Sequence, residues 1–255
     1  MTTLLFDLSG RTALVTGSSR GLGLALARGL AEAGATVVLN GRDAATLSES
    51  VSSLVGAGFD VHGKSFDVTV SGEVETAVAA IENEVGPIDI LVNNAGIQRR
   101  AALVDMTGDE WGAVIETNLT SVFLVGQAVG KRMIERERGK IINICSLMSE
   151  VARPSIANYT AAKGGLKMLT RAIAVEWGPH NIQCNGIGPG YFATEMTRPL
   201  YEDESFNRRI CERTPAGRWG KPEELVGTLV FLASSASDFV NGQVIYVDGG
   251  ILAGL

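Results

Sequence analysis

Histidine and cysteine are scarce in this chain, and their scarcity excludes several kinds of active site. The 255 residues contain two histidines, His62 and His180, and three cysteines, Cys145, Cys184 and Cys211. A hydrolase of the Ser-His-Asp type would need one of these two histidines as its base. The cysteines are odd in number and lack metal-ligand spacing. We therefore expect no metal site, and we assign acid–base chemistry to other side chains.

A basic surface and long apolar runs are also missing. The formal net charge is −6, which argues against a nucleic-acid-binding surface. The sequence has no run of 18 apolar residues, and its start lacks the charged and apolar regions of a signal peptide. We expect a cytoplasmic protein with neither a nucleic-acid nor a membrane partner.

Apolar stretches of strand length alternate with helical patterns along the whole chain. The sequence predicts helices at 21–33, 44–56, 70–85, 109–136, 156–178 and 222–236, and strands at 11–17, 35–40, 60–66, 88–94, 139–146, 181–187 and 243–250. This alternation is typical of a mainly parallel sheet with helices on both faces, and right-handed crossovers favour a doubly wound topology. No linker or repeat divides the chain, so residues 1–255 are predicted to form a single Rossmann-type α/β domain with seven strands.

The stretch 188–221 interrupts this alternation. It contains several prolines and glycines and only one possible short helix, near 202–212. A long irregular segment after a strand is often a lid or a substrate loop. A substrate loop is the favoured interpretation, and a flexible insertion is the alternative.

A glycine-rich turn, TGSSRGLG at 16–23, follows the first predicted strand and opens the first predicted helix. Glycines at these positions let the backbone turn sharply and approach a pyrophosphate at a helix N-terminus. The spacing departs from G-x-G-x-x-G, because three residues separate the first two glycines. The turn predicts a dinucleotide site formed by Gly17, Ser19, Arg20, Gly21, Leu22 and Gly23.

The second predicted strand ends without the acidic residue that NAD sites use. Such an acid accepts hydrogen bonds from the adenosine ribose, but this strand ends in Asn40, Gly41 and Arg42. Arg42 and Arg20 would bind a 2′-phosphate through charge-assisted hydrogen bonds. We predict NADP rather than NAD, and the alternative is that Arg42 is a solvated surface charge.

Further cofactor contacts are predicted where the third and fourth strands end. The carboxylate of Asp67, which Val68 follows, could accept a hydrogen bond from the adenine amino group. Asn94, Ala95 and Gly96 come after the fourth strand, where small residues would let the cofactor lie against the chain. For the neighbouring Asn93, a structural tie between strands and a ligand contact are equally compatible with the sequence.

Ser146, Tyr159 and Lys163 form the candidate catalytic group. Tyr159 and Lys163 are four positions apart in a predicted helix and would project from one face. An ammonium beside a phenol favours the phenolate, which predicts a lowered pKa for Tyr159. Ser146 would donate to the same substrate oxygen, an arrangement suited to proton transfer at a hydroxyl or carbonyl. A chance surface pair is the alternative for this spacing taken alone.

Taken together, these motifs resemble those of the short-chain dehydrogenase/reductase family across essentially the whole chain. The resemblance implies that Tyr159 is the general acid or base and that Ser146 hydrogen-bonds the reacting oxygen. Lys163 would contact the nicotinamide ribose and lower the tyrosine pKa, and Asn118 would support a proton-relaying water. Residues expected at the nicotinamide end are Pro189, Gly190 and Thr194.

Within that family, the stretches NNAGIQRR, INICSLMSE and HNIQCNGIGPGYFATEMT are similar to a branch that interconverts gluconate and 5-keto-gluconate. Arg99 and Arg100 follow a strand end where ligands of open α/β sheets bind, and they could pair with a sugar-acid carboxylate. Glu150 and Arg153 could contact substrate hydroxyls. For the two arginines, a solvent-facing or subunit-interface pair is the alternative.

Rival functions and the assembly complete the sequence-based expectations. Another reductase of the family could act on 3-oxoacyl-carrier protein or on a different polyol or ketose, although the acidic chain shows no clear basic patch for a carrier protein. A dinucleotide-binding sensor without catalysis is the non-enzymatic alternative. The resemblance also implies a homotetramer, in which 109–136 and 156–178 pack across one interface and the C-terminal strand across another.

Overall fold

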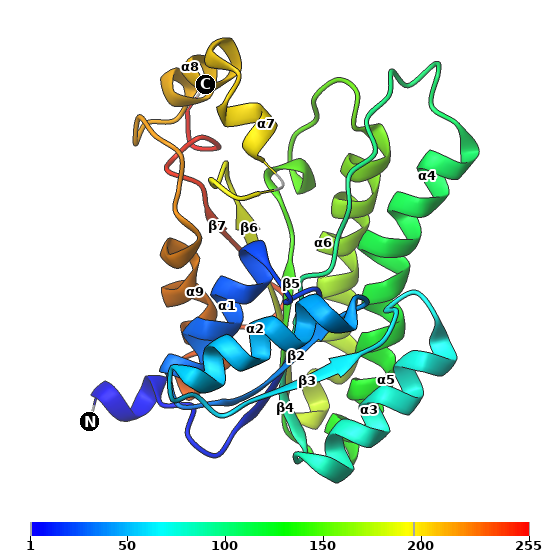
Figure 1. Ribbon diagram of the computed structural model, residues 1–255, viewed down its shortest axis with the longest axis vertical. Coiled ribbons are helices and arrows are strands. Elements are labelled where there is room, and N and C mark those ends of the chain that lie inside the picture. Colours follow the sequence, from blue (N-terminus) through cyan, green and yellow to red (C-terminus); the bar gives the residue numbers. More distant parts are fainter. Residues whose placement is uncertain (1, 196, 255) are drawn as a thin grey trace.

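Seven parallel strands form a single sheet at the centre of the protein (Figure 1). The computed structural model describes residues 2–195 and 197–254. Its strands are β1 (Thr12–Val15), β2 (Thr36–Gly41), β3 (Val61–Ser65), β4 (Ile88–Asn93), β5 (Gly139–Ile144), β6 (Ile182–Pro189) and β7 (Val244–Val247). Their order is β3-β2-β1-β4-β5-β6-β7, so the direction of winding reverses between β1 and β4. Ligands of such sheets bind outside the carboxyl ends of the strands at this switch point. The predicted doubly wound, seven-stranded domain is confirmed.

Helices cover both faces of this sheet (Figure 1). One face carries α1 (Gly21–Glu32), α2 (Ala44–Gly56) and α9 (Val226–Ala233). The other carries α3 (Ser71–Glu84), α5 (Ser121–Glu135) and α6 (Ala157–Trp177), with α4 (Gly108–Ile115) beside α6. The remaining helical segments are the 3-10 turns η1 (Thr2–Phe6), η3 (Leu147–Ser149), η4 (Gly178–His180), η5 (Pro222–Leu225) and η6 (Ser235–Ser237), the π-helix η2 (Glu116–Thr120), and α7 (Arg198–Tyr201) and α8 (Glu204–Arg213).

Burial on both faces explains the continuous apolar runs of the central strands. All six residues of β4 and all six of β5 are buried. Successive side chains point to opposite faces, so Leu91 packs with the α3, α5 and α6 side while Ile90 and Val92 pack with the α1 and α9 side. Cys145 and Cys184 are buried free thiols, as expected for small apolar fillers.

The stretch Gly108–Glu135 is one long helical element, made of α4, the π-helix η2 and α5. Its 28 residues have the length and hydropathy of a membrane span, with 39% of the most apolar window buried. A core helix of a soluble domain has the same properties, and α5 packs against α3 and β4. This element therefore covers the sheet as the predicted helix 109–136 was expected to do.

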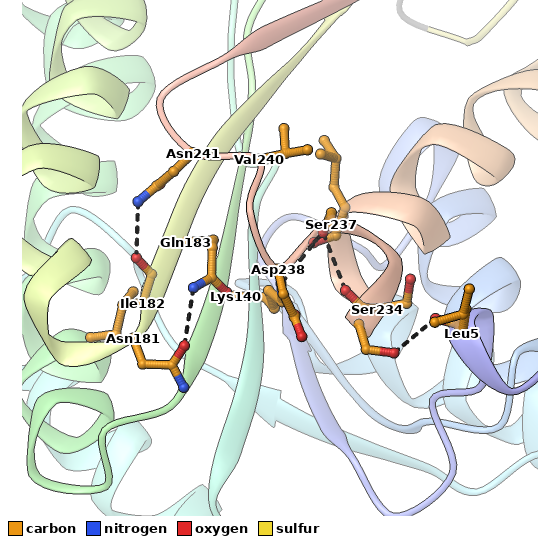
Figure 2. Close-up of polar contacts among 12 residues, drawn as sticks. Leu5, Lys140, Asn181, Ile182, Gln183, Ser234, Ser237, Asp238, Val240 and Asn241 are labelled. Atoms are coloured by element: carbon orange, nitrogen blue, oxygen red, sulfur yellow. Dashed lines mark hydrogen bonds and ion pairs between the residues drawn. The ribbon is translucent and has the colours of Figure 1, made fainter.

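The amino ends of the strands, opposite the cleft described below, are held by polar contacts (Figure 2). The buried ammonium of Lys140 on β5 lies 2.7 Å from a carboxylate oxygen of Asp238. Asn241 donates to the Ile182 carbonyl at 3.3 Å, and Ser235 donates to the Leu5 carbonyl at 3.2 Å. These contacts fasten the segment between α9 and β7 to β5, β6 and η1.

The segment 188–221 contains α7 and α8 and lies above β6 and β7 (Figure 1). Asp203 caps α8, because its carboxylate accepts from the backbone of Ser205 and Phe206. Tyr191 makes edge-to-face contacts with Phe206 and Trp219, at ring-centre separations of 5.9 and 5.4 Å. Aromatic pairs of this geometry stabilise local packing, so this segment is a packed structure with more helix than the sequence predicts.

Candidate active site

A cleft of about 870 Å³ opens at the carboxyl ends of the strands. It is lined by the glycine turn, the ends of β2 to β6, the start of α6 and the segment after β6. All the cofactor-site residues predicted from the sequence line it, and so do Asn118, Ser146, Tyr159 and Lys163. One cavity therefore unites the dinucleotide motif with the candidate catalytic group, although the two are far apart in the sequence.

The glycine turn has a backbone that only glycine accommodates. Gly17 and Gly21 have φ values of +60° and +58°, in the left-handed region that other residues seldom adopt. At Gly23, a Cβ atom would lie 2.3 Å from the Gly17 carbonyl oxygen. The N-terminus of α1 follows this tight turn directly. Its free backbone amides form an anion-binding site.

Two asparagines fix the turn relative to the sheet. Asn40, at the end of β2, accepts a hydrogen bond from the Gly17 amide at 3.1 Å. The Asn94 side chain donates to the carbonyls of Thr16 and Gly17, both at 2.9 Å. Asn93 donates to Asn143 at 2.9 Å, so it ties β4 to β5, which agrees with the structural interpretation. The sequence analysis missed the role of Asn40, for which no motif gave a signal.

The adenosine end of the cleft carries exposed positive charge. Arg20 is exposed, and the Arg42 side chain is 73% exposed with a nitrogen 3.5 Å from an Asp67 carboxylate oxygen. Burial acts to raise the pKa of Asp67, but hydrogen bonds from Thr69 and the Arg42 charge outweigh it and lower the pKa. A Cβ atom on Gly41 would lie 2.9 Å from the Ser19 hydroxyl. The position that carries an acid in NAD sites is therefore crowded, while two guanidiniums are available for a phosphate.

Tyr159 and Lys163 lie one turn apart on α6 and face the cleft. The Lys163 ammonium is 5.6 Å from the centre of the Tyr159 ring and donates to the Ile144 carbonyl at 2.6 Å. Ser146 follows β5 and accepts from the Met148 amide at 3.2 Å, which fixes its side chain at the start of η3. The predicted trio is thus brought together at one point of the cleft.

The pKa of Tyr159 differs from the sequence-based expectation. Burial raises the pKa of this phenol, and a hydrogen bond with Ser146 opposes the rise without reversing it. Burial also lowers the pKa of Lys163 to about 8. The predicted lowering of the tyrosine pKa is therefore wrong for this structure, because removal from water disfavours the phenolate more than its neighbours favour it.

Asn118 is completely buried within the π-helix η2. Its side-chain amide donates to the carbonyls of Ile97 and Val114 at 3.0 and 2.9 Å, and its oxygen accepts from the Ile97 amide at 3.2 Å. These contacts hold the loop after β4 against the helix. A π-helix at a cleft wall is a common feature of functional sites, and the sequence pattern gave no sign of it.

Two arginines face the opposite end of the cleft from the adenosine site. Arg100 donates to the Gln98 side chain, and Arg153 lies over the Phe206 ring, 5.4 Å from its centre. Burial lowers the pKa of Arg100, and the nearby charge of Arg153 lowers it further. An anion bound between these guanidiniums would relieve their repulsion, so this end of the cleft suits a carboxylate.

Arg99 and Glu150 lie outside the set of residues that line the cleft. Arg99 is exposed, and its carbonyl accepts from Asn158 at 3.2 Å. Glu150 forms an ion pair with Lys167 and accepts from the Tyr246 hydroxyl at 2.7 Å. The structure does not support the predicted substrate contacts of these two residues, because neither lines the cleft and the Glu150 carboxylate is engaged by Lys167 and Tyr246 instead.

The fold and the site together define a dinucleotide-dependent oxidoreductase. Over residues 17–252 the chain matches a family model described as enoyl-(acyl carrier protein) reductase. It is 58% identical over 251 residues to a gluconate 5-dehydrogenase of Gluconobacter oxydans (strain 621H), with 98% of each chain covered. It is also 53% identical over 251 residues to a 2-dehydro-3-deoxy-D-gluconate 5-dehydrogenase of Formosa agariphila, covering 98% of this chain and 95% of that one.

Among solved structures, one of a gluconate 5-dehydrogenase from Burkholderia cenocepacia J2315 in complex with NADP and tartrate has a TM-score of 0.98. The two chains are 51% identical, and the match covers 100% of both. The chain belongs to the short-chain dehydrogenase/reductase family. The resemblance that the motifs indicated is confirmed.

Proposed function

We propose that the protein is an NADP-dependent oxidoreductase that interconverts D-gluconate and 5-keto-D-gluconate. One observation carries this proposal: a single cleft has arginines for a 2′-phosphate at one end, the Ser-Tyr-Lys group at its centre, and arginines for a carboxylate beyond it. The similarity to a gluconate 5-dehydrogenase and to a structure that contains NADP and tartrate supports both ligand assignments.

The residues of the cleft fit a bound dinucleotide. A Cβ atom on Gly17 would lie 2.8 Å from the Ala95 Cα atom, so the glycine turn packs directly against the loop after β4. Gly21, Gly23 and the amides of α1 would hold the pyrophosphate. Arg20 and Arg42 would bind the 2′-phosphate, and Pro189, Gly190 and Thr194 would line the nicotinamide end. Bound NADP supplies the hydride chemistry.

Tyr159 and its neighbours would carry out the proton transfer. Reduction of a ketone requires a protonated acid next to the carbonyl oxygen, and burial keeps Tyr159 protonated by raising its pKa. Ser146 would donate a second hydrogen bond to the same oxygen. Lys163, whose pKa is about 8, is mostly charged at neutral pH and stabilises the phenolate left after transfer. In the oxidising direction, that phenolate accepts the substrate proton.

A carboxylate anchor explains selectivity for a sugar acid. Arg100 and Arg153 would bind the carboxylate of the substrate in the cleft. With the carboxylate fixed, only a carbon farther along the substrate would reach Tyr159. Such positioning is a large part of rate enhancement. The distance between the anchor and the tyrosine would therefore select the carbon that reacts.

A substrate panel tests the proposal. NADPH oxidation is measured with 5-keto-gluconate, other keto sugar acids, ketoses and a 3-oxoacyl thioester, and NADP reduction is measured with gluconate and other polyols. The largest kcat/KM is expected for the gluconate pair. A larger value for a neutral ketose or for the thioester would overturn the assignment.

A related sugar acid is the second candidate substrate. The 53% identity to a 2-dehydro-3-deoxy-D-gluconate 5-dehydrogenase favours it, and the same arginine anchor would serve its carboxylate. Because this compound lacks a hydroxyl on carbon 3 and keeps the one on carbon 5, a direct comparison with gluconate in the NADP-reduction assay separates the two candidates. A higher kcat/KM for the deoxy compound would select it.

We further propose a cytoplasmic homotetramer. The three cysteines are free thiols, as is usual in a reducing compartment. Apolar side chains are exposed on the long helices, including Phe123 on α5 and Met168 and Val175 on α6, and they are available to pack against a second subunit. Light scattering after size exclusion tests the assembly: a mass four times that of the chain is expected, and a monomer would contradict it.

A further inference from the structure

The position of Ser146 depends on a short turn that is held from outside the cleft. Ser146 is the N-cap of η3, and its hydroxyl accepts from the Met148 amide at 3.2 Å. The Ser149 amide in turn donates to the Ser146 carbonyl at 2.9 Å. The serine therefore moves with η3 as one unit, and contacts that fix the end of η3 also fix the reacting hydroxyl.

Three contacts fasten the end of η3 to neighbouring elements. The Ser149 hydroxyl donates to the Lys163 carbonyl on α6 at 2.9 Å. The Glu150 carboxylate forms an ion pair with Lys167, also on α6, and accepts from the Tyr246 hydroxyl on β7 at 2.7 Å. One carboxylate thus joins the turn to both a helix and a strand.

The helix contact lies on the face that carries the catalytic pair. Tyr159, Lys163 and Lys167 follow one another at intervals of four residues, so they stack along one face of α6. Glu150 holds Lys167, one turn beyond the catalytic lysine. Any shift of η3 relative to α6 would therefore change the separation between Ser146 and Tyr159 directly.

The strand contact reaches the nicotinamide wall. The Tyr246 ring packs so closely on Gly188 that a Cβ atom there would lie 2.3 Å from it. Gly188 precedes Pro189 and Gly190, which line the cleft. Through Tyr246, the Glu150 carboxylate is linked to the strand that supports the predicted nicotinamide end.

The Glu150 cluster is partly shielded from water. The side chain of Lys167 is 19% exposed and that of Glu150 is 36% exposed. Hydrogen bonds from Lys167 and Tyr246 lower the pKa of Glu150, so the carboxylate is ionised throughout the neutral range. An ion pair of this kind, reinforced by a neutral donor, orients side chains better than an exposed pair does.

We propose that Glu150 is a positioning residue for catalysis, which holds Ser146 at the correct distance from Tyr159 by joining η3 to Lys167 and Tyr246. This inference rests on the proposed oxidoreductase function, because its test measures turnover. This role differs from the substrate contact predicted from the sequence, and the two roles have different kinetic consequences. Loss of a substrate contact raises KM, whereas misplacement of a group that acts in the transition state lowers kcat.

The test compares Glu150→Ala and Glu150→Gln with the wild type in single-turnover NADPH oxidation at saturating substrate. For Glu150→Ala we expect the rate to fall by about 10- to 100-fold, the range that a misplacement near 1 Å produces. KM and the NADPH dissociation constant should stay within about twofold. Glu150→Gln keeps an acceptor for both donors, so it should recover part of the rate.

Lys167→Met provides an independent check on the same link. It should reproduce the rate loss, and the double variant Glu150→Ala with Lys167→Met should lose little more than either single variant, since coupled residues are not additive. The control is Glu32→Ala, which removes the exposed partner of Arg28 far from the cleft and should leave the rate unchanged. Additive losses in the double variant would contradict the proposed link.

The outcomes separate this inference from the proposed function. A wild type that reduces no panel compound would overturn the function. An active wild type whose Glu150→Ala variant keeps its rate, or loses only substrate affinity, would overturn the positioning role. A crystal structure of Glu150→Ala adds a readout that needs no substrate: we expect the Ser146 hydroxyl to be displaced from Tyr159, and an unchanged position would also overturn the role.

Discussion

Lys163 is predicted to destabilise the folded protein at neutral pH while it serves the reaction. Burial lowers its pKa from the ordinary value of 10.5 to about 8. At 1.36 kcal/mol per pKa unit, this difference corresponds to a cost of about 3 kcal/mol for keeping the lysine charged in the folded state. The substitution Lys163→Met removes the charge and keeps most of the side-chain volume.

The sign of the pH dependence follows from linkage. Between pH 8 and 10.5 the unfolded chain binds more protons at this lysine than the folded protein does, so stability rises with pH in that window. Relative to Lys163→Met, the unfolding free energy of the wild type should increase by about 2 kcal/mol from pH 7 to about pH 9.5. The absolute difference at pH 7 is smaller than the cost above, because the variant loses the hydrogen bond from Lys163 to the Ile144 carbonyl.

Guanidinium unfolding of both proteins at the two pH values, followed by circular dichroism, measures this change. Titrations of groups that do not interact with Lys163 affect both proteins equally and cancel in the comparison. Parallel pH dependences would refute the reasoning, because they would mean that the lysine has the same pKa in the folded and unfolded states. A fall in relative stability with pH would reverse the sign and refute it equally.

Three further substitutions test the cleft. Gly23→Ala places a Cβ atom 2.3 Å from the Gly17 carbonyl oxygen and should weaken NADPH binding at least about tenfold by fluorescence titration, whereas Gly112→Ala, in open space, should not. Arg42→Ala should cost about 1.5–3 kcal/mol of NADPH binding and leave NADH binding nearly unchanged; equal losses for both would contradict a phosphate contact. Arg100→Ala should raise the KM for gluconate far more than that for NADP, and equal changes would point instead to a subunit interface.

The sequence predicted the fold well because its signals are local. Apolar runs such as 88–94 indicate buried strands without reference to the rest of the chain. The turn at 16–23 requires glycines because its backbone conformation and close contacts exclude larger residues. The four-residue interval between Tyr159 and Lys163 likewise places both on one helix face. Each of these features depends on residues that are close together in the sequence, so a single sequence is enough to predict it.

Features that depend on distant partners were missed or misread. Glu150 follows Ser146 by four residues, but its contacts are 17 and 96 residues away in the chain, so nearness in sequence suggested a substrate role. The pKa of Tyr159 depends on burial, which the spacing of Tyr and Lys does not reveal. The π-helix around Asn118 and the short helix α7 were also missed, whereas α8 lies where the possible helix near 202–212 was predicted and begins at the local cap Asp203.

Single-turnover kinetics of Tyr159→Phe test the central claim most directly. The variant removes one hydroxyl from the cleft and leaves the glycine turn and both arginine pairs in place. The account predicts that NADPH binds with unchanged affinity, while reduction of 5-keto-gluconate nearly ceases. Turnover at the wild-type rate with bound NADPH would contradict the assignment of this hydroxyl as the proton donor.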